Sequence, residues 1–298
     1  MKNFLNRNYK PNYHTLEKIS KNVRKLLAPN PSPFTFHGTG TYIVGIEEIC
    51  IIDPGPKVES HIRNLLNQIN KRSIKHIFIT HTHSDHSPAA EILKQETGAK
   101  TYGFGPYPGM KTNNDFEEGH DTRFIPDIFL EDGQEVEADG WTIKAIHTPG
   151  HTSNHMCYGL EEDKILFTGD HVMGWATTVI VPPDGDMTEY IKSLEKIKKL
   201  NYTRYLPTHG SSIDNPEQFV RALISHRKMR EKQILDELRK NNISLEKMVE
   251  KFYANTDKKL WKAAEKSLLA TLISLERKEL VCREKKYGSI SNNWKLRV

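Results

Sequence analysis

The sequence predicts an α/β fold followed by a smaller module of helices and a terminal hairpin. Two runs of strand-like segments with interleaved helical segments fill residues 16–215, which is typical of α/β proteins. From residue 216 onward the pattern changes to long helices and one hairpin. A third observation locates the chemistry: a loop with three histidines follows a buried strand, and this is where α/β sheets place their ligands.

The first run of strands leads into this histidine-rich loop. β-branched and aromatic residues predict its strands, and apolar residues spaced three and four apart predict its helices. The expected strands are 41–44, 48–52, 74–79 and 99–102, and the expected helices are 58–69 and 89–97. Residues 16–27 can form an edge strand or a short helix, and the strand is favoured.

The second run supplies further loops at strand ends. Its expected strands and helix are 135–138, 141–147, 156–160, 164–168 and 204–206, with the helix at 187–200. Residues 103–121 join the two runs with Gly, Pro, Asn and acidic residues. A loop of this length in a compact domain is usually functional or mobile.

The histidine-rich loop has a demanding spacing. His81 and His83 are two residues apart, so on an extended segment their side chains point the same way and can hold one metal ion. Asp85 and His86 follow where the chain begins to turn, and they can face a second ion. Imidazole and carboxylate groups are ligands of a borderline cation such as zinc. A polar loop without metal is the simpler alternative, which this spacing disfavours.

Four ligands do not complete two metal sites, and three more candidates lie just past strand-like segments. These candidates are His151, Asp170 and His209. Each has a glycine beside it, which permits an unusual backbone conformation.

Five motifs thus occur in a fixed order along the chain. They are the histidine loop, Asp53 in Ile-Ile-Asp-Pro-Gly at 51–55, Thr-Pro-Gly-His-Thr at 148–152, Phe-Thr-Gly-Asp at 167–170, and Leu-Pro-Thr-His-Gly at 206–210. Together they resemble the metallo-β-lactamase superfamily of dinuclear hydrolases over about residues 16–215. The resemblance implies a four-layer αββα sandwich with two metal ions at one edge of its two sheets.

The resemblance also implies a role for each candidate. The implied ligands of two Zn²⁺ ions are His81, His83 and His151 for the first ion, Asp85, His86 and His209 for the second, and Asp170 as the bridge. Asp53 is expected to orient a ligand histidine instead of binding metal.

The implied reaction is hydrolysis by a hydroxide that bridges the two ions, because bound metal lowers the pKa of water from 15.7 to about 7. Asp85 is expected to orient this hydroxide and take up its proton. His155 is expected either to donate a proton to the leaving group or to support the site through a hydrogen bond. The chain shows no motif for a serine or cysteine nucleophile.

Residues 216–298 are expected to form a separate linker helix and winged-helix-like module. A helix to about residue 240, a second capped by Ser244, a third opened by Asp257 and a hairpin within 281–296 favour this arrangement. This part carries 20 Lys and Arg against 11 Asp and Glu, whereas the rest of the chain carries 23 against 27. An acidic partner would explain this basic excess. The simpler explanation is that lysine-rich helices are exposed to solvent.

A basic winged-helix module after such a core resembles the lactamase-like endoribonuclease family. Further matching segments are Asn30-Pro31, the turn at 38–42, Thr177-Thr178-Val179, 224–227 and 231–235. The resemblance implies cleavage of single-stranded RNA. His226 is expected either to face the cleft or to lie on the helix surface.

Other function classes stay open. A thioester hydrolase of the glyoxalase II type, or hydroxyacylglutathione hydrolase, shares the ligand set but depends on a different helical C-terminal domain. A second alternative is not an enzyme: a metal-stabilised module whose winged helix binds nucleic acid. The winged helix can also serve as a dimerisation arm or lid, so a homodimer is a further alternative.

The composition indicates the cellular compartment that we expect for the chain. The chain is 37% hydrophobic and 27% charged, and it has no apolar run near the roughly 18 residues of a membrane span. Residues 1–10 lack the apolar core of a secretory signal, which also disfavours an exported β-lactam hydrolase. The dispersed Cys50, Cys157 and Cys282 indicate a reducing compartment without a disulfide framework. We therefore expect a cytoplasmic enzyme with no membrane partner.

Overall fold

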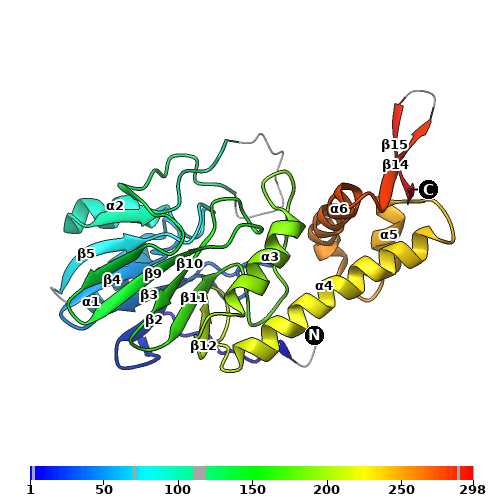
Figure 1. Ribbon diagram of the computed structural model, residues 1–298. Helices are drawn as coiled ribbons and strands as arrows, with labels where there is room; N and C mark the ends of the chain where they lie inside the picture. The colour runs from blue at the N-terminus through cyan, green and yellow to red at the C-terminus, as the bar shows by residue number, and fades with distance from the viewer. Residues whose placement is uncertain (2–3, 70–71, 110–118, 287–288, 298) are drawn as a thin grey trace.

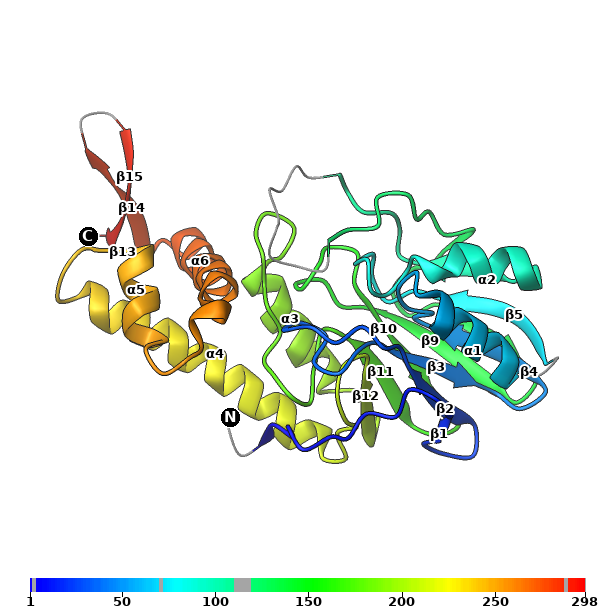
Figure 2. The same ribbon diagram turned by 180° about the vertical axis from the view of Figure 1, so that it is seen from behind.

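The computed structural model describes residues 1, 4–69, 72–109, 119–286 and 289–297. Two sheets face each other and helices cover their outer faces, while a smaller unit extends from one end (Figures 1 and 2). The first sheet has the strand order β1-β2-β3-β4-β5-β6-β7, and the second has the order β12-β11-β10-β9-β8.

The first sheet is antiparallel from β1 to β4 and parallel from β4 to β7. Its strands are β1 (Glu17–Lys18), β2 (Val23–Leu27), β3 (Gly40–Val44), β4 (Glu48–Ile52), β5 (Ser73–Phe78), β6 (Lys100–Gly103) and β7 (Ile128–Phe129). The helices α1 (Glu59–Ile69) and α2 (Ala89–Thr97) connect its parallel strands.

The second sheet is antiparallel except for the parallel pair β11 and β12. Its strands are β8 (Glu135–Ala138), β9 (Trp141–His147), β10 (Met156–Leu160), β11 (Ile165–Gly169) and β12 (Arg204–Pro207). The helix α3 (Met187–Ile197) crosses between β11 and β12 and begins at Asp186, whose side chain accepts hydrogen bonds from two backbone N–H groups of the first turn.

The chain then enters the long helix α4 (Pro216–Leu238), which leads into the smaller unit. This unit contains β13 (Ile243–Ser244), α5 (Leu245–Phe252), a 3-10 turn (Lys258–Leu260), α6 (Trp261–Arg277), β14 (Val281–Lys286) and β15 (Ser289–Leu296). The three strands pair in the order β13-β15-β14. Its own buried cluster, which includes Leu238, Leu272 and Trp294, explains why these elements pack together.

Three other buried clusters separate four layers. One lies between the sheets and includes Phe78 and Phe167. A second packs α1 and α2 against the first sheet through Leu65 and Leu93, and a third packs α3 and α4 against the second sheet around Leu194. The αββα sandwich followed by a winged-helix unit is therefore confirmed, whereas the boundary between residues 215 and 216 stays a prediction.

The expected elements differ from the structure mainly at their ends, except that residues 16–27 form two antiparallel strands, β1 and β2, instead of one. The helix expected to open at Asp257 starts with a 3-10 turn and ends at Arg277, and the short β7 is not among the expected strands. Residues 110–118 of the long loop and 287–288 of the hairpin lie outside the described residues. Cys50 and Cys157 are buried and Cys282 is half-buried, and all three are free thiols. Across the described ranges, every helix is too short or too polar to span a bilayer.

Candidate metal centre

All seven expected ligands lie on loops that follow strands β5, β9, β11 and β12, and all seven side chains are buried. The buried strands fix the starting point of each loop, and the loops meet at one edge of the two sheets. The ligands fall into two sets. We call His81, His83, His151 and Asp170 the first ligand group, and Asp85, His86 and His209 the second ligand group.

In the first ligand group, three imidazole rings converge. His83 Nδ1 lies 2.9 Å from His81 Nε2 and 3.2 Å from His151 Nε2. Asp170 Oδ2 lies 3.7 Å from His151 Nε2. One ligand atom from each of the four residues lies within 4.8 Å of the others.

In the second ligand group, Asp85 Oδ2 lies 3.3 Å from His86 Nε2 and 3.1 Å from His209 Nε2. Asp170 Oδ1 lies 3.3 Å from His209 Nε2 and 3.7 Å from His86 Nε2. Asp170 thus turns one carboxylate oxygen toward each group, and this is the geometry that a bridging ligand requires.

These residues fit metal ions. Ligands at 2.0–2.1 Å around a tetrahedral cation lie about 3.4 Å apart, close to the separations within both groups. Within the described part of the chain, His86 Nε2 and Asp170 Oδ1 are buried and make no hydrogen bond. Buried polar atoms are rarely left without a partner, and a shared cation would satisfy both.

The electrostatics of the second ligand group favour a positive charge. Burial lowers the pKa of His86, but the carboxylates of Asp85, Asp53 and Asp170 outweigh it and raise the pKa well above its ordinary value. The pKa of His209 rises to about 10 because Asp170 and Asp85 outweigh the effect of burial. A proton or a metal ion can supply the charge that these carboxylates stabilise.

Asp53 lies directly behind the second ligand group. Its Oδ2 is 2.8 Å from His86 Nδ1, and it also accepts hydrogen bonds from the hydroxyls of Thr80 and Thr208. Its Oδ1 accepts from the Thr80 backbone N–H at 2.8 Å. This position suits the expected role, because a carboxylate on the far nitrogen fixes the orientation of a ligand imidazole.

Backbone carbonyls orient two other ligands. His209 Nδ1 lies 3.0 Å from Gly38 O, and His151 Nδ1 lies 2.9 Å from Val179 O. Gly38 has a φ of 132°, and a Cβ atom there would stand 2.0 Å from Ala28 O. Only glycine therefore lets this turn present its carbonyl to His209.

His155 supports the centre from behind instead of facing it. Its Nε2 accepts a hydrogen bond from the Asp170 backbone N–H at 3.2 Å, and its Nδ1 lies 2.9 Å from Thr148 Oγ1. The ring is fully buried and does not line the pocket described below. Of the two expected roles, the geometry favours support of Asp170, because both ring nitrogens are engaged.

Lys25 is a supporting residue that the sequence did not single out. Its buried Nζ donates a hydrogen bond to Gly210 O at 2.7 Å, next to His209. Burial lowers the pKa of this lysine to about 8, against a smaller opposing effect of Glu17. A lysine within a strand pattern gives no signal of this role, since such side chains usually reach solvent.

A pocket of 510 Å³ opens onto both ligand groups. The opposite wall belongs to α4 and to the unit that follows it. Lining residues with positive charge or aromatic rings are Arg7, Phe34, Trp175, Arg227, Arg230, Lys251, Phe252 and Tyr253. The Arg230 guanidinium stacks 4.4 Å from the centre of the Tyr253 ring. His226 also lines this pocket, so of its two expected positions the structure has the one toward the cleft.

The sequence does contain a signal that Arg227 is buried and has a hydrogen-bond partner. It lies three and four residues after Ile224 and Leu223, on the apolar face of α4, where a charged residue needs a partner. Its guanidinium donates to Thr178 O at 2.5 Å.

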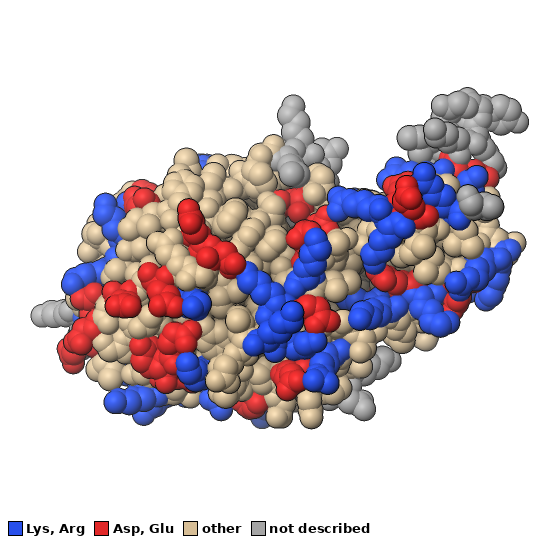
Figure 3. Space-filling model, in the orientation of Figure 1, with Lys and Arg blue, Asp and Glu red and all other residues tan. Residues whose placement is uncertain are grey.

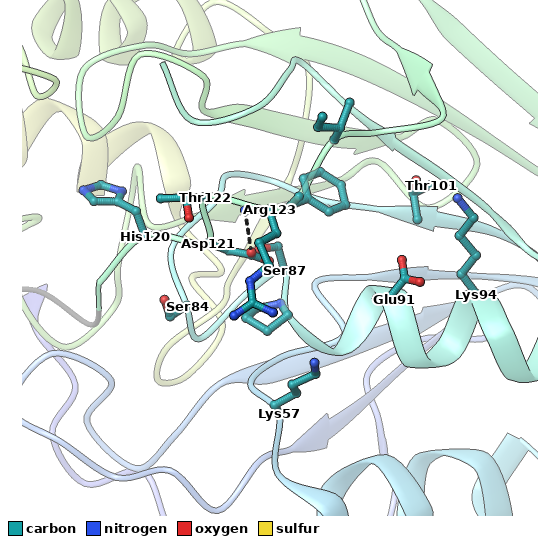
Figure 4. A pocket seen from close by; sticks show the side chains of 13 residues that line it. Lys57, Ser84, Ser87, Glu91, Lys94, Thr101, His120, Asp121, Thr122 and Arg123 are labelled. Atoms are coloured by element: carbon teal, nitrogen blue, oxygen red, sulfur yellow. Dashed lines mark hydrogen bonds between the residues drawn. The ribbon is translucent and has the colours of Figure 1, made fainter. Parts of the chain in front are cut away.

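A second pocket of 570 Å³ is lined by Ser84 and Ser87 of the histidine loop, together with Lys57, Asp121 and Arg123 (Figure 4). Ser87 Oγ donates to Asp121 Oδ2 at 2.8 Å. None of the seven expected ligands lines this pocket, so it is distinct from the candidate metal centre.

Comparisons with known proteins agree with this architecture. The profile of the metallo-β-lactamase superfamily matches residues 36–209, and that of the β-lactamase-associated winged helix domain matches residues 244–294. A β-lactamase-like protein 2 homolog of Caenorhabditis elegans is 38% identical over 231 residues, covering 76% of this chain and 74% of that protein. The Drosophila melanogaster homolog of the same name is 31% identical, covering 87% and 89%.

Solved structures show the same fold. A β-lactamase domain protein from Burkholderia ambifaria aligns with a TM-score of 0.79 at 19% identity, covering 97% of this chain and 95% of the other. A metallo-β-lactamase family protein from Thermus thermophilus aligns with a TM-score of 0.76 at 17% identity, covering 94% and 100%. With a family profile over more than half of its length and the ligand clusters in place, the chain belongs to the metallo-β-lactamase superfamily, whose members are typically metal-dependent hydrolases.

Proposed function

We propose that the chain is a dinuclear zinc hydrolase that cleaves single-stranded RNA. The observation that carries this proposal is the pocket of 510 Å³, which has ligand residues on one side and arginines with aromatic rings on the other. Proteins bind single-stranded nucleic acid with this combination, because cations hold the phosphates and rings stack on the bases. Lys and Arg side chains also gather over α4 and the C-terminal unit (Figure 3).

The ligand chemistry supports zinc, since five imidazoles and two carboxylates suit a borderline cation. Two such ions, when bound, would lower the pKa of water and polarise the bond under attack. Asp85 lines the pocket and is held by the Thr39 hydroxyl at 3.2 Å. Burial raises the pKa of Asp85, but His86 and His209 lower it well below its usual range. Its carboxylate is therefore ionised, and in the proposed reaction it orients the attacking water and accepts a proton.

A thioester hydrolase of the glyoxalase II type is the second candidate. The same pocket has an apolar part formed by Met1, Leu5, Met173, Leu260 and Ala263, which suits an acyl chain. Both substrates would use the same metal centre, so the side chains of the pocket wall determine which of them binds.

The deciding experiment compares labelled single-stranded RNA, lactoyl-glutathione and a β-lactam side by side, with Asp170→Ala as the blank. We expect zinc-dependent RNA cleavage that the blank lacks. Each phosphate contact should weaken RNA binding by about 0.7 log units per tenfold increase in salt. Efficient thioester turnover without RNA cleavage would overturn the nuclease proposal, and RNA binding without any hydrolysis would favour a metal-stabilised binding module.

A matched pair of variants tests the pocket wall. Arg230→Met should weaken RNA binding and lower the salt slope by about 0.7, because one phosphate contact is lost. Arg221→Met removes an exposed arginine of the same helix that pairs with Glu217 outside the pocket, and it should leave both quantities unchanged. Equal effects of the two substitutions would mean that general charge, and not this wall, binds the strand.

A further inference from the structure

The segment of residues 177–180, which we call the strap, runs between the metal centre and the C-terminal helices. Within the described part of the chain, the strap makes no backbone-to-backbone hydrogen bond. Its hydrogen bonds therefore all involve side chains, and Ile180 packs in the buried cluster of the second sheet.

On one side, the strap contacts two ligands of the first group. Val179 O lies 2.9 Å from His151 Nδ1, and Thr178 Oγ1 donates to the Asp170 carbonyl at 2.7 Å. The strap thus fixes the ring of one ligand and the backbone of the bridging carboxylate.

On the other side, two C-terminal helices hold the strap. Arg227 of α4 donates to Thr178 O at 2.5 Å, and Ser267 Oγ of α6 accepts from the Ile180 N–H at 3.1 Å. Both side chains are buried. The two bonds flank Val179, so they define where its carbonyl stands.

A second clamp reaches the same ligand loop. Arg277 at the end of α6 pairs with Asp186, whose backbone N–H donates to Gly150 O at 2.8 Å, one residue before His151. Helix α6 therefore holds two segments that contact the His151 loop. One is the strap, which orients the His151 ring, and the other is Asp186, which bonds the residue before His151.

We propose that Arg227 and Ser267 are positioning residues for the first ligand group, acting on His151 and Asp170 through the strap. This inference rests on the metal centre of the proposed function but not on its substrate. The C-terminal helices thus help to build the metal centre as well as to wall its pocket. Because Arg227 also lines the pocket, a substrate that contacts it acts on the side chain that holds the strap.

The test measures zinc affinity by competition with a chromophoric chelator, without substrate, so that a lost substrate contact cannot change the result. Ser267→Ala and Arg227→Met should each weaken one of the two binding steps about tenfold, as changes around ligand residues do. They should weaken the other step less, because Asp170 is the only described residue touched by the strap that also faces the second ligand group. Ser267→Thr keeps the hydroxyl and should restore wild-type affinity.

Ser274→Ala is the matched control. It removes another buried hydroxyl of α6, which bonds Thr188 Oγ1 of α3 at 2.8 Å and does not touch the strap. It should lower the unfolding temperature about as much as Ser267→Ala without changing zinc affinity.

Two outcomes would overturn the inference, and they differ in what else they imply. If folded Ser267→Ala binds both ions as tightly as wild type, the positioning role is wrong and the proposed centre stands. If the wild-type chain itself binds no zinc, the proposed centre is wrong as well. Should Arg227→Met fail to fold, Ser267→Ala and its threonine counterpart decide alone.

Discussion

The two ligand groups differ in where their support comes from. The second ligand group is held by Asp53 and by the Gly38 turn, which both belong to loops of the first sheet. The first ligand group is held in part by the strap, which two C-terminal helices secure. One half of the centre is thus held by loops of the first sheet, whereas the other half depends on α4 and on α6 of the C-terminal unit.

The largest effect should come from the residue that the two groups share. Asp170→Ala removes both carboxylate oxygens, one of which faces the first group and the other the second. Zinc content should therefore fall at both positions, and activity should nearly vanish. The loss should exceed the roughly 10–100-fold effect of changing a residue behind a ligand. Elemental analysis of protein purified without chelators, together with turnover, checks this, and a variant that keeps its full metal content would contradict the bridging geometry.

The second effect should be confined to one group. Asp53→Asn keeps the shape of the side chain but replaces a carboxylate oxygen by an amide, so the hydrogen bond from His86 or from a threonine is lost. We expect one zinc-binding step to weaken by roughly 10–100-fold. This should be the step that Ser267→Ala affects less, and the double variant should then weaken both steps strongly. If both single variants weaken mainly the same step, the two groups are not independently supported.

The smallest effect concerns Lys25, beneath the His209 loop. An unfolded lysine keeps its proton up to about pH 10.5, whereas the buried one loses it near pH 8, so the unfolded state binds more protons between these values. Stability should therefore rise with pH in this window, by roughly 2–3 kcal/mol between pH 7 and 10 relative to Lys25→Met.

Urea unfolding of the wild type and Lys25→Met at several pH values measures this difference, since all other titrations are common to both proteins. A constant difference from pH 7 to 10 would mean that the lysine is not desolvated in the folded chain.

The sequence predicted the architecture well because buried strands carry a strong local signal. The strand at 156–160 and the helix at 89–97 were expected with the bounds that the structure has. The two-residue β7 was missed, since a pair of residues shows no periodicity. The 3-10 turn before α6 was missed because its capping residue, Asp257, serves a helix of either type.

The candidate site was predictable to a different degree. Spacing and motif order led to the seven residues that the structure brings together in two groups. The supports of these residues were not predictable, because Val179 and Gly38 act through backbone carbonyls that every residue possesses. For His155 the sequence allows two roles, and its hydrogen bonds to the Asp170 backbone and to Thr148 favour one of them.

The two orienting carbonyls have an unequal consequence for how this centre tolerates mutation. At position 179 the useful atom belongs to the main chain, so another side chain leaves this carbonyl available as long as the backbone keeps its path. At position 38 the same kind of atom is available only if no side chain exists, because a Cβ would strike Ala28 O. Two residues with the same task thus respond differently to substitution: a new side chain leaves the carbonyl in place at position 179 and displaces it at position 38.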